Sequence, residues 1–235
     1  MKNLYNIYQT LYKEYGPQGW WPFLELKTTN STKKGASEGY HILEYDFPKN
    51  EDQFFEIILG CILTQNTTFT SVVKSLNNLK DVNALNKKAI EDMPIDEFKE
   101  LIRPSGYFNQ KANYVHEFIK FYNSLEGKIP TRDELLAVKG IGEETADSIL
   151  LYAYKMPEFK VDAYTKRLLL ELGVIEEKTK YKEVKKLFED EISSKIEDQE
   201  ELVIVYQEYH ALIVEHGKRF YSKKPYGVGC FLKEI

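Results

Sequence analysis

The sequence predicts an all-α protein. Apolar residues recur at helical spacing along most of its 235 residues, and paired turn residues of the Asn-Gly type, which mark β-hairpins, are few. Thr131, preceded by Pro130 and followed three residues later by Glu134, forms the pattern of a helix capping box. These observations favour a chain of short, capped helices.

The expected elements follow in order. A first helix ends near Gly16, and the glycines and prolines of YGPQGWWP break regular structure after it. Residues 27–38 are polar and read as a loop, and YHILEYDF is expected to form a short strand or hairpin. Pro104 and Gly106 end the IDEFKELI helix. Further helices are expected at residues 51–63, 67–79, 95–102, 111–124, 132–138, 143–154, 163–172, 181–194 and 200–221.

Composition excludes several classes of protein. The longest near-continuous apolar run, Ile57 to Leu63, is far shorter than the roughly 20 residues that span a bilayer. The start of the chain lacks the pattern of a secretory signal, so we expect a cytoplasmic protein with no membrane contact. Two cysteines exclude a disulfide framework, and Cys61 is expected to be a buried thiol. His210 and His216 are six residues apart, which is not the spacing of a helical zinc pair, so we expect structural histidines and no metal site.

The net charge of −5 by itself argues against a nucleic-acid partner. The charge is unevenly distributed, however. Residues 189–201 carry seven acids and one lysine, a local charge of −6, which leaves the remainder of the chain at +1. Local basic faces are therefore compatible with the composition.

The stretch AVKGIGEETADSILLYA places Gly140 and Gly142 between two apolar helices. A helix that restarts directly after such a turn presents free amides, which attract phosphate, and Thr145 adds a hydroxyl. Glu143 and Glu144 would repel phosphate unless they face elsewhere or a cation mediates. The turn predicts a contact with a nucleic-acid backbone, and a plain helix–turn–helix is the alternative.

Three further stretches extend this pattern. They are ILGCILTQNTTFTSVV, RPSGYFNQKANYV and FKVDAYTKRLL, and the last of them carries Asp162. Together with the glycine turn, they resemble the helix-hairpin-helix DNA glycosylases of the endonuclease III superfamily over about residues 53–220. The resemblance implies a monomer that binds double-stranded DNA in a cleft between two helical lobes. It assigns the catalytic carboxylate to Asp162, for which a simple helix cap is the alternative.

The resemblance also implies a division of the chain. Residues 1–52 would form an N-terminal helix and a Trp-containing loop that pack on the C-terminal lobe. Residues 53–165 would form the central lobe with the helix-hairpin-helix, and residues 166–235 the C-terminal lobe with a degenerate iron–sulfur loop.

Two departures from the family are informative. Members that cut the strand carry a nucleophilic lysine two residues after the second glycine, where this chain has Glu144. Without that amine, we expect attack by water and no cleavage at abasic sites. Tyr221 and Gly227 stand where the family's cluster cysteines are expected, which implies no iron–sulfur cluster and aromatic packing by Phe220, Tyr221 and Phe231 in its place.

Two tryptophans suggest the substrate. The branch that includes monofunctional 3-methyladenine DNA glycosylases lines its base pocket with aromatic residues and a C-terminal lysine. The matching residues here are Trp20, Trp21, Phe69 and Lys218. An N-alkylated purine is a cation, which stacks well on aromatic faces and leaves readily. Packing between lobes is the alternative for the tryptophans, and phosphate contact or a solvated position is the alternative for Lys218.

The resemblance further implies the DNA contacts. Gln65, with Asn66 beside it, would fill the gap left by a flipped nucleotide, and helix capping is the alternative for this amide-rich turn. The strand would be held by Lys139, Gly140, Gly142 and Thr145, with an alkali cation on the hairpin carbonyls. The leading hypothesis is therefore a monofunctional glycosylase for alkylated purines. A uracil or thymine mismatch glycosylase and a non-catalytic DNA-binding module are the alternatives.

Overall fold

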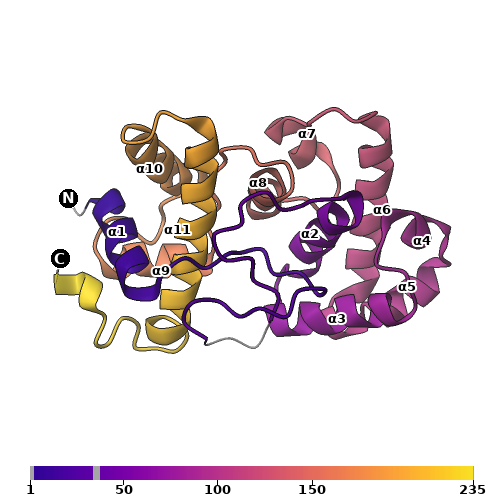
Figure 1. Cartoon of the computed structure of the whole chain (residues 1–235), viewed down its shortest axis with the longest axis horizontal. Coiled ribbons are helices and arrows are strands. Elements are labelled where there is room, and N and C mark those ends of the chain that lie inside the picture. The colour runs from indigo at the N-terminus through magenta and orange to yellow at the C-terminus, as the bar shows by residue number, and fades with distance from the viewer. Residues whose placement is uncertain (1–2, 34–37, 235) are drawn as a thin grey trace.

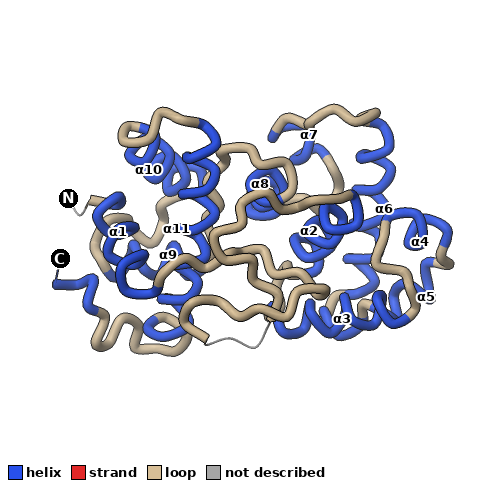
Figure 2. Tube along the Cα trace, viewed as in Figure 1, coloured by secondary structure: helices blue, strands red, loops and turns tan. Residues whose placement is uncertain are grey.

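The computed structural model describes residues 3–33 and 38–234, and within these residues every regular element is helical (Figure 2). The α-helices are α1 (Leu4–Tyr15), α2 (Glu51–Leu63), α3 (Phe69–Asp81), α4 (Lys87–Asp92), α5 (Ile95–Leu101), α6 (Phe108–Ser124), α7 (Arg132–Ala137), α8 (Glu143–Tyr152), α9 (Ala163–Glu171), α10 (Tyr181–Ser193) and α11 (Gln199–Phe220). Two 3₁₀ turns, η1 (Arg103–Ser105) and η2 (Phe231–Glu234), complete the set. The predicted all-α class is confirmed.

The helices form two groups (Figure 1). Helices α2 to α8 gather on one side, and α1, α9, α10 and α11 gather on the other with the C-terminal segment. Helix α1 packs against α10 and α11, which brings the two ends of the chain to the same side of the molecule. The predicted boundary after residue 165 falls inside α9, whose residues pack against α11.

The segment between α1 and α2 joins the two groups. Its Gln18 and Gly19 amides donate to the Glu208 carboxylate of α11, at 2.6 and 3.1 Å. A few residues later Trp21 packs against α2, where a Cβ on Gly60 would lie only 2.4 Å from its ring. The Trp-containing loop therefore contacts both groups, rather than the C-terminal one alone.

The prediction of a short strand or hairpin at residues 40–47 is wrong. Two loop segments are joined here by single backbone hydrogen bonds. The Phe23 amide donates to Gly39 O at 3.0 Å, and the His41 amide donates to Gly19 O at 3.1 Å. Isolated bonds of this kind satisfy buried backbone groups without a continuous ladder. Helix α4 was missed because it spans only six residues, capped by the Asn86 side chain.

The expected bounds of the other helices hold within a few residues. The largest difference is that α6 begins at Phe108, three residues before its expected start. Helix α3 begins at Phe69 after a Thr68 cap, and α8 ends at Tyr152, each two residues from the expected bound. The capping box at Thr131 and Glu134 is confirmed. No helix among the described residues is both long and apolar enough to cross a membrane.

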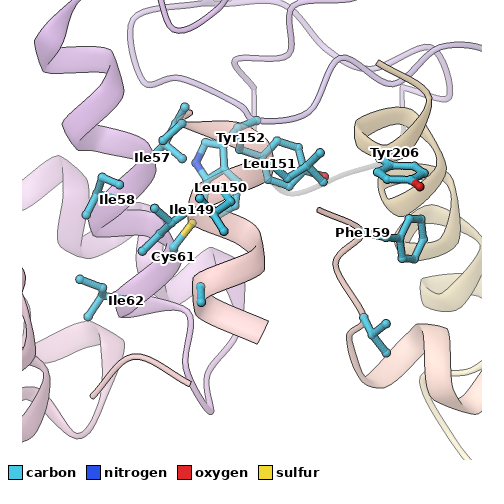
Figure 3. Packing of buried hydrophobic residues seen from close by; sticks show 14 of the residues in the cluster. Ile57, Ile58, Cys61, Ile62, Ile149, Leu150, Leu151, Tyr152, Phe159 and Tyr206 are labelled. Carbon is cyan, nitrogen blue, oxygen red and sulfur yellow. The ribbon is translucent and has the colours of Figure 1, made fainter. Parts of the chain in front are cut away.

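A continuous apolar core runs between α2 and α8 (Figure 3). Ile57, Ile58, Cys61 and Ile62 of α2 face the buried run of residues 149–152 in α8, and Cys61 is a buried free thiol as expected. On the other side of the molecule, Phe159 stacks on Phe188 at 4.1 Å between ring centroids. Burial of α8 fixes the helix that follows the glycine turn and therefore fixes the direction of the turn.

The C-terminal loop holds a polar and aromatic cluster. The Cys230 sulfur lies 3.2 Å from Tyr221 Oη and 3.1 Å from His216 Nε2, and Phe220 meets Phe231 edge to face. One buried thiol surrounded by rings does not fit an iron–sulfur cluster, which needs four ligands. The expected aromatic packing of Phe220, Tyr221 and Phe231 is confirmed.

Candidate active site

The glycine turn forms a tight hairpin between α7 and α8. Gly140 has a φ of +92°, and a Cβ there would lie 2.1 Å from the Tyr114 ring of α6. Gly142 caps α8 with extended backbone, and no atom lies within 4 Å of the position of its missing Cβ. Gly140 is thus required for packing, whereas Gly142 leaves open space at the N-terminus of α8 where a backbone can approach.

The two glutamates after the turn form ion pairs beside it. Glu143 lies 3.5 Å from Arg132, and Glu144 lies 3.6 Å from the Lys160 ammonium. Burial raises the pKa of Glu144, although the charge of Lys160 opposes this effect. These contacts reduce the electrostatic objection to an anion at the turn, because each carboxylate faces a cation, although Arg132 is shared with Asp147.

Asp162 caps the N-terminus of α9. Its Oδ1 accepts hydrogen bonds from the Thr165 amide at 2.8 Å and the Thr165 hydroxyl at 2.9 Å, and its side chain is 13% exposed. Burial acts to raise the pKa of this carboxyl, but interactions with His210, Lys160 and the Thr165 amide outweigh it and hold the pKa below its ordinary value. Asp162 is therefore an ionised, largely buried carboxylate, and its role as a cap is compatible with a catalytic one.

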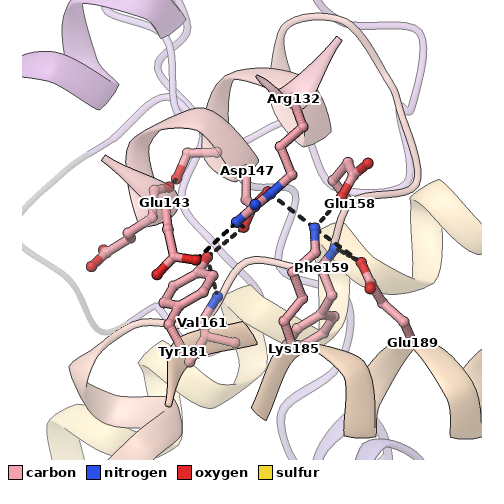
Figure 4. Close-up of polar contacts among 11 residues, drawn as sticks. Arg132, Glu143, Asp147, Glu158, Phe159, Val161, Tyr181, Lys185 and Glu189 are labelled. Carbon is pink, nitrogen blue, oxygen red and sulfur yellow. Dashed lines mark hydrogen bonds and ion pairs between the residues drawn. The ribbon is translucent and has the colours of Figure 1, made fainter. Parts of the chain in front are cut away.

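A buried ion-pair cluster fixes the segment that leads to Asp162 (Figure 4). At its centre, the fully buried Asp147 of α8 accepts from Arg132, Tyr181 and Lys185. The cluster also binds backbone, since the Phe159 amide donates to Glu189 at 2.9 Å and the Val161 amide to Tyr181 Oη at 3.2 Å. The cluster thus connects α7 and α8 with α10 and holds the chain directly before Asp162.

A cavity of about 480 Å³ opens between the two groups of helices. Its lining combines the turn after α2, the hairpin, and two lysines on either side of Asp162 in the sequence. The lining residues are Trp21, Cys61, Thr64, Gln65, Asn66, Gly140, Gly142, Glu143, Glu144, Thr145, Ser148, Lys160, Lys166 and Tyr181. The structure thereby brings together most of the candidate DNA-contact residues, whereas Lys139 is exposed on the hairpin.

Gln65 occupies a defined position in this cavity. Its side-chain amide donates to Gly140 O at 2.9 Å and to Thr145 Oγ1 at 3.1 Å. The residue expected to enter the DNA stack is therefore bound to the hairpin in this structure, and entry would require both bonds to break. Asn66 is exposed beside it, with a φ of +52°.

The aromatic candidates form one cluster. Trp20 lies 4.8 Å from Phe69 and 5.4 Å from Trp21 between ring centroids, and Trp21 lies 5.5 Å from Tyr152. Trp21 is buried, and Phe69 lines a second cavity of about 290 Å³ beside α3. Lys218 is exposed near the end of α11 and is absent from the lining of both cavities as far as the structure describes them.

Sequence reasoning missed three residues near Asp162. From the sequence, Lys160 and Tyr152 have no assigned role, and His210 is interpreted as structural. In the structure His210 Nε2 faces Asp162 Oδ2 at 3.6 Å, and His210 Nδ1 lies 2.7 Å from Tyr152 Oη. No local spacing signals this arrangement, because the residues lie on helices separated by many residues in the sequence.

Comparison with known proteins shows the family of the chain. Residues 59–194 match the model of the HhH-GPD superfamily base excision DNA repair proteins, and the chain belongs to that superfamily. A putative DNA repair glycosylase of Methanocaldococcus jannaschii is 39% identical over 99% of this chain and 94% of its own length. Endonuclease III of Sulfolobus acidocaldarius is 30% identical over 77% of this chain and 80% of its own length.

Solved structures agree on the fold. A 3-methyladenine DNA glycosylase of H. pylori, bound to 1,N6-ethenoadenine, superimposes with a TM-score of 0.67 at 28% identity, covering 93% of this chain and 98% of that one. An endonuclease III trapped covalently on DNA gives the same TM-score at 20% identity, covering 98% and 93%. The predicted endonuclease III-like fold is confirmed.

Proposed function

We propose that the protein is a monofunctional DNA N-glycosylase that releases N-alkylated purines of the 3-methyladenine type from double-stranded DNA. The observation that carries the proposal is the environment of Asp162, an ionised and largely buried carboxylate two residues after Lys160, which lines the cavity together with Glu144. By the sequence resemblance, Glu144 stands at the position of the family's nucleophilic lysine. The H. pylori glycosylase, named for 3-methyladenine, supports this class of lesion.

In this mechanism Asp162 stabilises the positive charge that develops on the sugar as the base departs. It also orients the attacking water or accepts its proton. An alkylated purine is already cationic, so it leaves without a strong general acid. The partly exposed rings of Trp20 and Phe69 would stack on the base, and the buried Trp21 would support them from behind. Cation–π attraction contributes about 0.5–2 kcal/mol.

Strand cleavage is not part of the proposed reaction. A Schiff base with the sugar carbon requires an amine at residue 144. The carboxylate of Glu144 contains no nitrogen and cannot form one. The nearby amine of Lys160 is held in an ion pair with Glu144. A relative of this chain is named endonuclease III, so strand cleavage is measured separately from base release.

The hairpin would hold the DNA strand. The amides at the N-terminus of α8 and the open space at Gly142 suit a phosphate, with Lys139 and Thr145 beside them. Gln65 would leave Gly140 and fill the gap of the flipped nucleotide, which frees the Gly140 carbonyl for an alkali cation. We propose that no iron–sulfur cluster is needed and that a monomer acts.

The test uses duplexes that carry single 3-methyladenine, 7-methylguanine, uracil or mismatched thymine bases. Base release and strand cleavage are scored separately for the wild type and for Asp162→Asn. Release of the cationic bases without cleavage, abolished in the variant while DNA binding persists, supports the proposal. Release confined to uracil or thymine would move the substrate to the mismatch class, and binding without any release would indicate a non-catalytic module.

The lyase question has its own variant. Glu144→Lys is expected to gain a covalent adduct with abasic DNA that borohydride traps, whereas the wild type forms none. Glu144→Gln, which changes the same residue without adding an amine that can form a Schiff base, is the matched control. Trapping by the wild-type protein would contradict the inference from Glu144.

A further inference from the structure

His210 of α11 is a buried polar residue that the proposed reaction has not yet used. Its ring is 1% exposed, and its Nε2 has no hydrogen-bond partner within the described part of the chain. That nitrogen faces Asp162 Oδ2 at 3.6 Å. An unpaired buried polar atom is costly, so a nitrogen directed at the candidate catalytic carboxylate indicates a role there.

The second ring nitrogen determines which tautomer is present. Tyr152 Oη lies 2.7 Å from His210 Nδ1 and 3.3 Å from Gln207 O. If the hydroxyl donated to the carbonyl and accepted from Nδ1–H, Nε2 would present a lone pair to the Asp162 carboxylate, which is repulsive. If the hydroxyl donates to Nδ1, Nε2 carries the proton and faces Oδ2 as a donor.

The carboxylate is arranged to use such a donor. Thr165 occupies Oδ1 with two hydrogen bonds, which leaves Oδ2 for His210 and for the reacting sugar or water. Burial and the charge of Lys160 lower the pKa of His210, so the ring is neutral near pH 7.

We propose that His210, held by Tyr152 in its Nε2–H tautomer, is a positioning residue that donates to Asp162 Oδ2 and keeps the carboxylate ionised and oriented toward the sugar. The inference rests on the proposed function. These contacts also connect the aromatic cluster with the carboxylate, since the Trp21 ring packs on Tyr152 and Tyr152 binds His210.

The charged and titratable groups around Asp162 set the expected pH dependence. Lys160 precedes it in the same segment, Glu144 and Tyr152 lie on α8, and His210 lies on α11. Burial alone raises the pKa of Asp162, so loss of the His210 donor moves protonation of the carboxylate to higher pH. The rate of a variant without the donor should therefore fall relative to the wild type as pH decreases.

The experiment compares His210→Leu, which removes the donor, with His210→Gln, whose amide nitrogen can reach the position of Nε2. His216→Leu is the matched control, because His216 is also a buried histidine of α11 bound to a tyrosine, at 2.8 Å from Tyr15 Oη. Single-turnover base release is measured from pH 4.5 to 8. Affinity for a duplex with a cationic pyrrolidine in place of the sugar, against the neutral tetrahydrofuran duplex, reports the Asp162 charge without catalysis.

We expect His210→Leu to release base about ten-fold more slowly at pH 7, with the ratio to wild type falling further at lower pH. It should also lose its preference for the pyrrolidine duplex at higher pH than the wild type, while His210→Gln and His216→Leu retain both properties. Wild-type behaviour of His210→Leu, or equal loss in His210→Gln, would overturn the proposal.

Folding and function are separated by two further measurements. If thermal unfolding shows that His210→Leu does not fold, Tyr152→Phe serves instead. It keeps the ring but removes the donor to Nδ1, and the same pH-dependent loss is expected, whereas an unchanged profile would refute the role. If the wild type releases no base but still prefers the pyrrolidine duplex, the proposed function fails, and the pyrrolidine preference alone decides the role of His210.

Discussion

Replacement of Asp147 by Asn tests how strongly the buried ion-pair cluster supports the site. Asp147 has no exposed side-chain surface, and it accepts from Arg132 at 2.7 and 3.2 Å, from Tyr181 at 2.8 Å and from Lys185 at 3.0 Å. Removing one partner of a buried pair costs about 3–5 kcal/mol, because the other charges remain buried. Two of these partners retain other contacts here, which places the expected cost near the lower limit.

The retained contacts can be named. Lys185 keeps Glu158 and Glu189, while Arg132 is 24% exposed and keeps Glu143. We therefore expect Asp147→Asn to lower the free energy of unfolding by about 3 kcal/mol, which for a chain of this size lowers Tm by about 6–12 °C. Chemical and thermal unfolding followed by circular dichroism measure both quantities.

Glu143→Gln is the matched control for this variant. Glu143 pairs with the same Arg132, but at 3.5 Å and with 44% of its side chain exposed, so we expect a change of at most about 1 kcal/mol. If Asp147→Asn lies within 1 kcal/mol of the wild type, or if the two variants are equally unstable, the cluster does not carry the stability assigned to it.

Three further predictions concern α2 and the hairpin. Burial raises the pKa of Glu56 to about 7, so ionisation of this group destabilises the folded state as pH rises from 4.5 through 7. The free energy of unfolding of Glu56→Gln, measured in urea, should therefore rise relative to that of the wild type by up to about 3 kcal/mol across that range. A difference between the two proteins that does not change with pH would contradict this. Gly60→Ala should destabilise the protein by about 1–3 kcal/mol through contact with Trp21, together with altered tryptophan fluorescence, and unchanged Tm and emission would argue against that packing. Gly140→Ala, with its positive φ and crowded Cβ, should cost more stability in thermal unfolding than Gly142→Ala, and the reverse order would refute the assignment of roles in the hairpin.

Local signals predicted what is local in this structure. The capping box of Thr131 and Glu134, the helix break at Pro104 and the glycine turn each depend on residues a few positions apart, and each appears where it was expected. The segment at residues 40–47 was misjudged because Tyr40 and Phe47 are buried as parts of a loop that bridges the two groups of helices, whereas Leu43 is 61% exposed. Apolar residues in this segment therefore reflect tertiary packing of a loop rather than strand pairing.

The environment of Asp162 depends on contacts between distant helices, which no spacing rule encodes. Gly217 illustrates the point, since a Cβ there would lie 2.4 Å from the Tyr164 ring, so only glycine lets α9 approach α11 this closely. That approach sets the distance between Asp162, at the start of α9, and His210, two turns before Gly217 on α11. The sequence motif thus identifies the candidate carboxylate, while the packing of a helix far along the chain places His210 at 3.6 Å from it. Substitutions in α11 that widen this crossing should impair Asp162 even though they touch no motif residue.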